Sequence, residues 1–308
     1  PISQISLHTD LGIDYFADVE ARICLTAETD VVIPTGWDTV DQDIIGVGRQ
    51  ELILFLAPSG GGKSVGMTNF AMNLCKQGLN GVYITLEMRD KLVARRFDSM
   101  IATISGREIY NNLQRVVDEV NLFQANHKCK VYVKRMREST TTANDISAYV
   151  TDLQRRTGIK VDFIVVDYID IMKPVEKVDS GNMFSKDKVV TEEVRALGMD
   201  FNAIIISASQ LGRDAWDVIR SGGVLGQDHI QGGMSKINTS DLAIAIVKDE
   251  AMDAAGMIEF QYLKTRNSGG VGKRRKMAWN TISLRIGDLD EQKLVKNSVE
   301  VIQRKAGT

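Results

Sequence analysis

The sequence predicts an α/β fold in which helices flank a mostly parallel, twisted sheet. From about residue 30, apolar segments of strand length alternate with amphipathic segments of helix length. A glycine-rich turn joins the first clear strand to the first long helix. The composition is that of a globular protein, with 44% hydrophobic and 25% charged residues in 308. Ligands of such sheets bind beyond the carboxyl ends of the strands, so we expect the functional site there.

Length, charge and cysteine usage exclude several classes of protein. The chain is long enough for one large or two ordinary domains. Its formal net charge of −2 means that any basic surface for nucleic acid must be local. No apolar run reaches the roughly 20 residues of a membrane helix, and the N-terminus does not resemble a signal peptide. Three scattered cysteines, Cys24, Cys75 and Cys129, fit a reducing compartment, so we expect a cytoplasmic protein without membrane contact.

The expected elements follow in chain order. Apolar residues at helical spacing predict a short helix over 11–23, either a linker helix or a helix packed on its own domain. The predicted strands are 51–57, 81–87, 129–134, 162–168, 203–210, 242–247, 257–265 and 277–286. The predicted helices are a segment after the glycine-rich turn that ends at Gly78, then 90–102, 106–125, 143–158 and 192–201.

Two polar or glycine-rich segments, 173–188 and 220–241, have no clear pattern of secondary structure. Loops of this length inside a compact domain are usually functional or disordered. We expect an N-terminal arm and linker helix over 1–29, one main domain over 30–286, and a polar C-terminal tail over 287–308.

The glycine-rich turn matches the phosphate-binding P-loop, GxxxxGK[ST], between a strand and a helix. It reads APSGGGKS over 57–64, with Ala57 in place of the first glycine. Consecutive glycines let backbone N–H groups surround phosphate oxygens, and the helix N-terminus adds its positive dipole end. An incidental glycine-rich turn is the alternative. The candidate nucleotide-binding residues are Ser59, Gly60, Gly61, Gly62, Lys63, Ser64 and Val65.

Polar residues end three other predicted strands. Asp167 follows four apolar residues, as in a Walker B strand, and is predicted to hold Mg²⁺ together with Ser64. Glu87 ends the strand over 81–87 and is a candidate base for activating water, although it also fits a surface glutamate. Gln210 ends the strand over 203–210, where an amide can sense a γ-phosphate.

A basic cluster ends the late strand over 257–265. Lys264 and Arg266 are two residues apart, so both side chains can point at one anionic target, such as a nucleotide at a subunit interface. The alternative is a solvated hairpin edge. The basic run KRRK, 273–276, is expected on a solvated turn, with phosphate-backbone contact as the second reading.

Five segments in this order resemble the RecA-like motor domain of DnaB-type replicative DNA helicases, in particular the branch found in T-even-type phages. They are APSGGGKS, TLEMRDKLVARRFD, IVVDYIDIM, SASQLGRDAW and KTRN. The resemblance covers about residues 11–286. It implies a homohexameric ring that hydrolyses ATP with Mg²⁺ between subunits, translocates 5′ to 3′ on single-stranded DNA, and unwinds duplex DNA.

The resemblance also assigns roles. Lys63 and Ser64 correspond to the P-loop pair, Glu87 to the catalytic base and Gln210 to the γ-phosphate sensor. Arg266, with Lys264, corresponds to the finger that reaches a neighbouring subunit. The segments 173–188 and 220–241 fall where the family lines its channel, which makes Gly232, Gly233 and Lys236 the candidate DNA contacts.

The family also has a linker helix, matched by 11–23, and an N-terminal domain that this sequence lacks, so we expect a motor fragment, with a minimal relative of the family as the alternative. A primase and a helicase loader are the implied partners, in a bacterial host cytoplasm if the protein is phage-encoded. The alternatives are a RecA-type recombinase filament, an ATP-gated assembly or regulatory module, and, least favoured, a small-molecule kinase.

Overall fold

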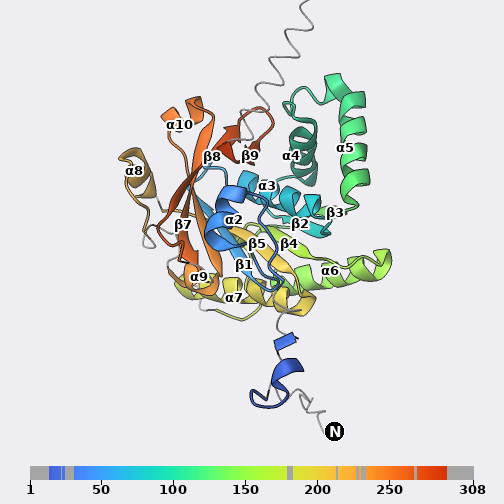
Figure 1. Cartoon of the computed structure of the whole chain (residues 1–308), viewed down its shortest axis with the longest axis vertical. Helices are drawn as coiled ribbons and strands as arrows, with labels where there is room; N and C mark the ends of the chain where they lie inside the picture. The colour runs from blue at the N-terminus through green and yellow to red at the C-terminus, as the bar shows by residue number, and fades with distance from the viewer. Residues whose placement is uncertain are drawn as a thin grey trace, which may run out of the picture.

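The computed structural model describes residues 14–21, 23–24, 31–178, 183–212, 214–226, 229, 234–266 and 269–289 (Figure 1). Within these residues a nine-stranded sheet has the order β3-β2-β4-β5-β1-β6-β7-β8-β9. The first six strands in this order are parallel, and β7 to β9 continue the sheet antiparallel. The strands are β1 Leu52–Ala57, β2 Gly81–Thr85, β3 Val131–Arg135, β4 Phe163–Asp167, β5 Ile204–Gln210, β6 Leu242–Val247, β7 Met257–Thr265, β8 Arg274–Asn280 and β9 Arg285–Gly287.

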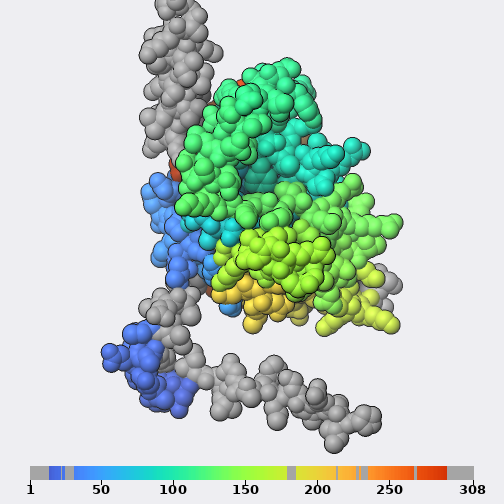
Figure 2. All heavy atoms as spheres, turned by 90° about the vertical axis from the view of Figure 1, so that its right-hand side faces the viewer, coloured from blue at the N-terminus to red at the C-terminus, as the bar shows by residue number. Residues whose placement is uncertain are grey.

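Helices cover both faces of the sheet. One face packs against α2 (Asp38–Ile44), α3 (Lys63–Lys76) and α4 (Asp90–Ala102), and α5 (Leu113–His127) lies outside α4 (Figure 1). The other face packs against α6 (Ala143–Thr157), α7 (Met183–Phe201), α8 (Ala215–Arg220) and α9 (Met234–Thr239). The short α10 (Glu250–Ala254) precedes β7. Figure 2 shows the α4 and α5 region standing above the α6 region on one side of the molecule.

The core explains why the central strands read as continuous apolar runs. All six residues of β1 are buried. Ile53 and Phe55 contribute to the core on the α3 face, whereas Leu52 and Leu54 contribute to the core on the α7 face. This alternation follows from the two-residue period of a strand, and a parallel sheet covered on both faces buries both sets. The fold is therefore the α/β class that the sequence predicts.

The structure corrects the prediction of one strand over 277–286. The chain forms β8, turns, and forms β9 instead. The Asn280 side chain accepts hydrogen bonds from the backbone N–H groups of Ile282 and Ser283, each at 3.0 Å. Such local bonds stabilise a turn at the expense of a strand.

Other boundaries also differ from expectation. Helix α7 begins at Met183 and α9 at Met234, both inside segments expected to be loops. Helix α5 begins at Leu113, after a short 3-10 turn, rather than at residue 106. Of the helix expected over 11–23, the structure describes a turn before Val19 and helical backbone from there, with every described side chain exposed.

The basic run 273–276 is not the solvated turn that the sequence predicts. Its last three residues begin β8. Lys273 and Arg275 form ion pairs with Asp43 of α2, at 2.9 Å and 2.6 Å, and Arg274 pairs with Glu259 of β7. Three of the four charges thus hold β8 within the domain.

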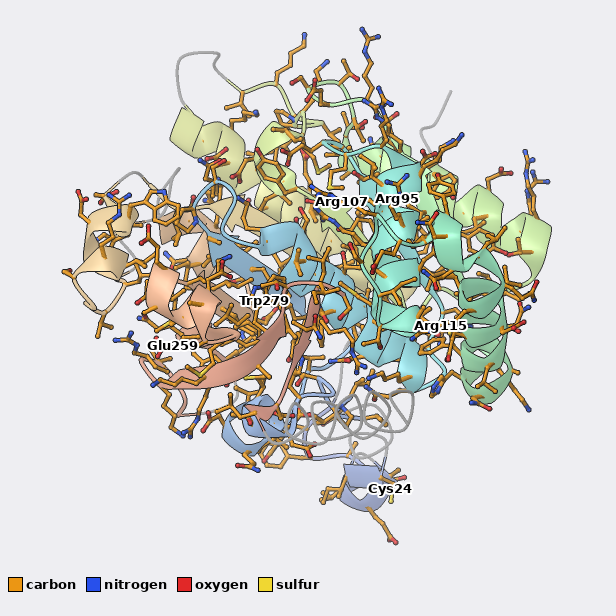
Figure 3. All side chains as sticks on the ribbon, turned by 90° about the horizontal axis from the view of Figure 1, so that it is seen from above. Cys24, Arg95, Arg107, Arg115, Glu259 and Trp279 are labelled. Carbon is orange, nitrogen blue, oxygen red and sulfur yellow. The ribbon has the colours of Figure 1, made fainter. Side chains whose placement is uncertain are left out.

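The cysteines are free thiols. Cys75 and Cys129 are buried, whereas Cys24 is exposed on the N-terminal segment, apart from the sheet (Figure 3). Over the part of the chain that the structure describes, every helix is too short or too polar to cross a membrane.

Candidate nucleotide site

The carboxyl ends of four neighbouring strands bring most of the predicted site residues to one edge of the sheet. In the parallel register, Ala57 at the end of β1 lies beside Gln210 at the end of β5. Asp167 at the end of β4 lies beside Thr85 at the end of β2. This is the edge at which an open α/β sheet binds its ligands.

The P-loop fits tightly between β1 and α3. Gly62 precedes the first residue of α3 and has φ of 98°, a conformation that residues with a side chain rarely adopt. A Cβ atom on Gly61 would lie 2.9 Å from the Cβ of Ala57. The loop therefore requires these glycines, and the N-terminus of α3 offers its backbone N–H groups at the same place. The first P-loop position, Ala57, is accommodated within this turn.

Lys63, the first residue of α3, lies among carboxylates. Burial lowers the pKa of the ammonium, and the nearby Asp170, Glu87 and Asp167 oppose that shift. Its Nζ lies 3.4 Å from the carbonyl oxygen of Ala57 and 5.5 Å from the centre of the Tyr168 ring. The site therefore holds a cation where a P-loop places one for phosphate.

Asp167 is 1% exposed at the end of β4. Its carboxylate accepts a hydrogen bond from Ser64 Oγ at 3.1 Å and one from the Tyr83 hydroxyl at 2.9 Å. Burial raises the pKa of Asp167, and these two hydrogen bonds, with the Arg96 guanidinium, work against the rise. Tyr83 had no signal in the sequence beyond its place on β2, two residues before Thr85.

The donor set fits Mg²⁺. Among the described residues no group of three His, Cys, Asp or Glu side chains could hold a metal ion by itself. One carboxylate, one hydroxyl and substrate phosphates are, however, the usual ligands of magnesium in phosphoryl-transfer sites. Asp167 and Ser64, already in contact at 3.1 Å, would supply the two protein oxygens.

Glu87 and Gln210 follow or end the two strands, β2 and β5, that pair with the Asp167 strand β4. Glu87 stands two residues beyond β2, exposed, and its charge acts on both Lys63 and Asp167. Gln210 is half-buried, and its backbone N–H donates to Asp170 at 2.9 Å. The structure thus brings the predicted base and the predicted sensor to the edge that carries the P-loop.

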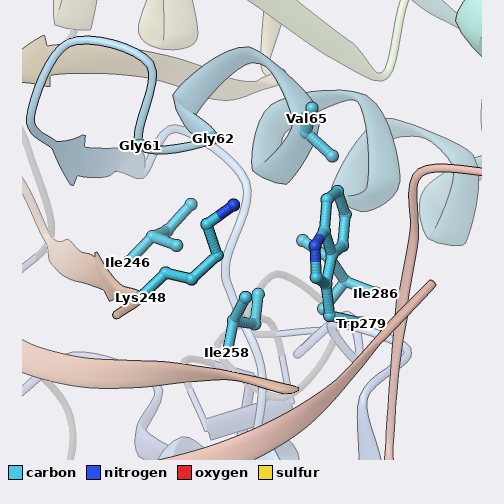
Figure 4. Close-up of a pocket in the computed structure, with 8 residues that line it drawn as sticks. All are labelled: Gly61, Gly62, Val65, Ile246, Lys248, Ile258, Trp279 and Ile286. Carbon is cyan, nitrogen blue, oxygen red and sulfur yellow. The ribbon is translucent and has the colours of Figure 1, made fainter. Parts of the chain in front are cut away.

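A shallow apolar hollow adjoins the P-loop (Figure 4). Its lining comes from the loop, α3 and the late strands: Gly61, Gly62, Val65, Ile246, Lys248, Ile258, Trp279 and Ile286. Lys248 lies over the Trp279 ring at 5.8 Å, and the Trp279 indole donates to Asp253 at 3.1 Å. No sequence motif indicates this wall, because its residues come from strands that are distant in the sequence.

Lys264 and Arg266 lie at the opposite edge of the sheet. Strand β7 runs antiparallel to β6 and ends beside Leu242, the first residue of β6, whereas the P-loop approaches Ile246. Lys264 Nζ donates to the carbonyl oxygens of Ile237 and Asn238 at 2.7 and 2.6 Å.

Arg266 pairs with Asp241, which also pairs with Arg195 at 3.1 Å. Lys264 and Arg266 thus have separate partners within the chain, rather than the single shared target that their spacing suggested. Neither contributes to the P-loop edge of its own chain.

Of the three residues expected to contact DNA, the structure describes one, Lys236. Gly232 and Gly233 lie outside the described residues. Lys236 is 1% exposed, and its Nζ contacts Asp170 at 2.7 Å and Asp187 at 2.9 Å. A buried, paired ammonium does not offer its charge to DNA phosphates, so we withdraw Lys236 as a direct DNA contact.

The fold and the loop geometry define a P-loop domain of the RecA-like α/β class. The sequence family described as DnaB-like helicase C-terminal domain matches residues 32–220, more than half of the chain. The chain therefore belongs to the DnaB-like helicase C-terminal domain family.

Relatives agree with this membership. The chain is 24% identical over 278 residues to the DnaB-like replicative helicase of Enterobacteria phage T4, covering 85% of this chain and 56% of the relative. It is 23% identical over 303 residues to the replicative DNA helicase DnaB of Rickettsia conorii, covering 89% and 52%. The chain thus spans about half the length of these curated relatives.

Solved structures agree on the fold. One, described as an ATPase domain, superposes with a TM-score of 0.73 at 17% identity, over 91% of this chain and 99% of that one. A DnaB-like replicative helicase, whose structure was described together with its interactions with primase, gives 0.71 at 16% identity, over 89% and 68%.

Proposed function

We propose that this chain is an ATP-driven DNA helicase motor that hydrolyses ATP between subunits of a homohexameric ring and moves along single-stranded DNA. The observation that carries the proposal is the position of the candidate catalytic groups at two opposite edges of the sheet in a DnaB-like domain. The P-loop, Asp167 and Glu87 share one edge of the sheet, and Arg266 stands at the other.

The P-loop edge would bind the triphosphate. Backbone N–H groups of 59–65 and the ammonium of Lys63 contact phosphate oxygens, and the apolar hollow with Trp279 accepts the base or ribose. Ser64 and Asp167 would hold Mg²⁺, which neutralises charge on the phosphates when bound.

Glu87 would act on the attacking water. Its carboxylate is exposed, and no hydrogen bond holds it among the described residues. It therefore remains available to orient a water molecule and take its proton. Gln210 would sense the γ-phosphate from the adjacent strand end.

Arg266 would complete the site of a neighbouring subunit. Leu242, beside the end of β7, and Ile246, beside the P-loop, are four residue steps apart along β6. At about 3.3 Å per residue this is about 13 Å of strand. Arg266 is half exposed, with 53% of its side chain accessible. An arginine supplied from another subunit stabilises charge on the transferred phosphoryl group.

The chain covers only about half the length of its curated relatives, so the activity of a whole helicase is part of this proposal. Unwinding of duplex DNA, 5′ to 3′ polarity, and work with a primase and a helicase loader belong to this proposal. Backbone N–H groups near Gly232 and Gly233 remain the proposed DNA contacts. They would explain DNA binding by a chain with net charge −2.

The test is ATP turnover against protein concentration, with and without single-stranded DNA. Interface sites predict turnover per chain that rises steeply with concentration and increases further with DNA, followed by unwinding of a forked duplex. Turnover independent of both would contradict the proposal.

Two rival functions predict other results. Filaments in electron micrographs, with strand exchange, would indicate a RecA-type recombinase. Rings whose ATP turnover is unchanged by single-stranded DNA would indicate an ATP-gated assembly or regulatory module.

A further inference from the structure

The strongest unexplained feature of the domain is a buried lysine that joins four elements. Lys236 of α9 is 1% exposed. Its Nζ contacts Asp170, just beyond β4, at 2.7 Å, Asp187 of α7 at 2.9 Å, and Ser209 Oγ of β5 at 3.2 Å. An ammonium has three protons to donate, and these three partners can accept all of them.

Asp170 links Lys236 to the edge of the sheet that carries the P-loop. Its second carboxylate oxygen accepts hydrogen bonds from the Ser209 hydroxyl at 3.1 Å and from the Gln210 backbone N–H at 2.9 Å. Gln210 lies beside Ala57, at the start of the P-loop. A chain of direct contacts therefore runs from Lys236 through Asp170 to the strand end that faces the P-loop.

The two residues of the Lys236–Asp187 ion pair come from the two segments that the family resemblance assigns to the DNA channel. Helix α7 begins at Met183, inside 173–188, and Asp187 lies on its first turns. Helix α9 begins at Met234, inside 220–241, and Lys236 is its third residue. The first turns of these two helices, which lie within the two segments, thus meet at one ion pair.

Stability alone does not explain such a junction in a core. Charges taken out of water lose hydration, and apolar residues of similar size are often equally stable there. Burial raises the pKa of Asp187, and Lys236 opposes that rise. What an ion network supplies instead is a defined arrangement of the elements that it joins, because each partner is costly to leave unpaired.

We propose that Lys236 is a positioning residue that couples the two DNA-channel segments to Gln210, so that nucleotide state and DNA affinity depend on each other through it. This inference rests on the proposed function, since it takes DNA and ATP as the ligands. Coupling of this kind is reciprocal and typically changes affinity about 5- to 150-fold.

The experiment measures the affinity of the full chain for a fluorescein-labelled oligothymidylate. It is done once with ADP and once with a non-hydrolysable ATP analogue, and the ratio of the two dissociation constants is the readout. We expect a ratio of about tenfold or more for the unaltered protein. The Lys236→Met variant keeps the length of the side chain and removes the charge, and its ratio is expected to fall below about threefold.

Two further variants keep the test decisive. Asp187→Asn preserves the shape of the side chain and the Lys236–Asp170 pair, so it should disturb the fold less than Lys236→Met, and its ratio should be intermediate. The matched control is Arg49→Met, which removes another partly buried ion pair, Arg49–Asp162 at 2.7 Å. This control should keep the full ratio.

The outcomes separate the two proposals. An unaltered ratio in Lys236→Met or in Asp187→Asn would overturn the coupling role, and so would an equal loss in Arg49→Met. Absence of oligothymidylate binding by the unaltered protein would instead contradict the proposed function.

Discussion

The carboxyl and amino edges of the sheet differ in whether their charged side chains have partners within the chain. At the carboxyl edge, Lys63 is surrounded by carboxylates without an ion pair of its own among the described residues, and Glu87 is exposed. At the amino edge, Arg266 is paired with Asp241, and Lys264 donates to two carbonyl oxygens. The first edge is arranged for a ligand, whereas the second is arranged to hold basic side chains in place.

Under the proposed function, this difference assigns the two edges of the sheet to two different subunits. A chain that kept all of its catalytic groups at one edge would be a self-contained enzyme. Here the arginine is held firmly at the edge remote from its own P-loop, with Asp241 itself fixed by Arg195 and by the backbone N–H of Leu52 at 2.9 Å. Substitutions at the carboxyl edge should therefore affect nucleotide binding and chemistry, whereas substitutions away from both edges and from the Lys236 junction should affect stability alone.

The largest expected effect comes from Lys63→Ala. The substitution removes the cation proposed to contact the phosphates, so ATP binding should fall by at least about 100-fold and turnover should be lost. Titration with a fluorescent ATP analogue measures the affinity. Unchanged affinity would contradict the assignment of the carboxyl edge as the nucleotide site.

Glu87→Gln should separate chemistry from binding at the same edge. The amide keeps the shape of the side chain but cannot take a proton from water, so kcat should fall by about 10²- to 10⁴-fold, with nucleotide affinity within about threefold of the original. Single-turnover hydrolysis and nucleotide titration measure the two quantities. Turnover close to that of the unaltered protein would mean that another group activates the water.

The smallest expected effect concerns Asp43, which pairs α2 with β8 and belongs to neither edge. Hydrogen bonds from Arg275 and Lys273 lower its pKa to about 2. Because the folded-state pKa lies below the unfolded value, the stabilisation is present above about pH 4 and is lost as the pH falls toward about 2.

Asp43→Asn should therefore lower the melting temperature near neutral pH, by the few degrees typical of about 1 kcal/mol. The difference from the unaltered protein should shrink as the pH is lowered from about 5 to about 3. Turnover should be unaffected. A difference independent of pH would show that the carboxylate charge is not the source of the stabilisation.

The sequence predicted the carboxyl edge well because its signals are local. A P-loop is a contiguous motif, and apolar strands that end in Asp167 or Gln210 predict a shared edge once the sheet is taken as parallel. Burial on both faces made the central strands continuous apolar runs, so they were predicted to within a residue or two.

The remaining features depend on contacts between distant segments. Burial of Lys236 depends on Asp170 and Asp187, which lie on other elements far back in the sequence. The basic run 273–276 looked solvated because its partner Asp43 lies on α2, far along the chain. The hollow beside the P-loop likewise combines β6, β7, β8 and β9. Neither hydrophobic periodicity nor a local motif predicts contacts between segments that are so far apart in the sequence.

An active site that uses both edges, from two different subunits, can be tested directly by mixing two inactive variants. Glu87→Gln and Arg266→Ala are combined in varying ratios, and ATP turnover is measured. We predict that each variant alone is inactive and that mixtures regain turnover, because some interfaces then combine an intact Glu87 with an intact Arg266. No recovered turnover at any ratio, in mixtures shown to assemble together, would contradict a site shared between subunits.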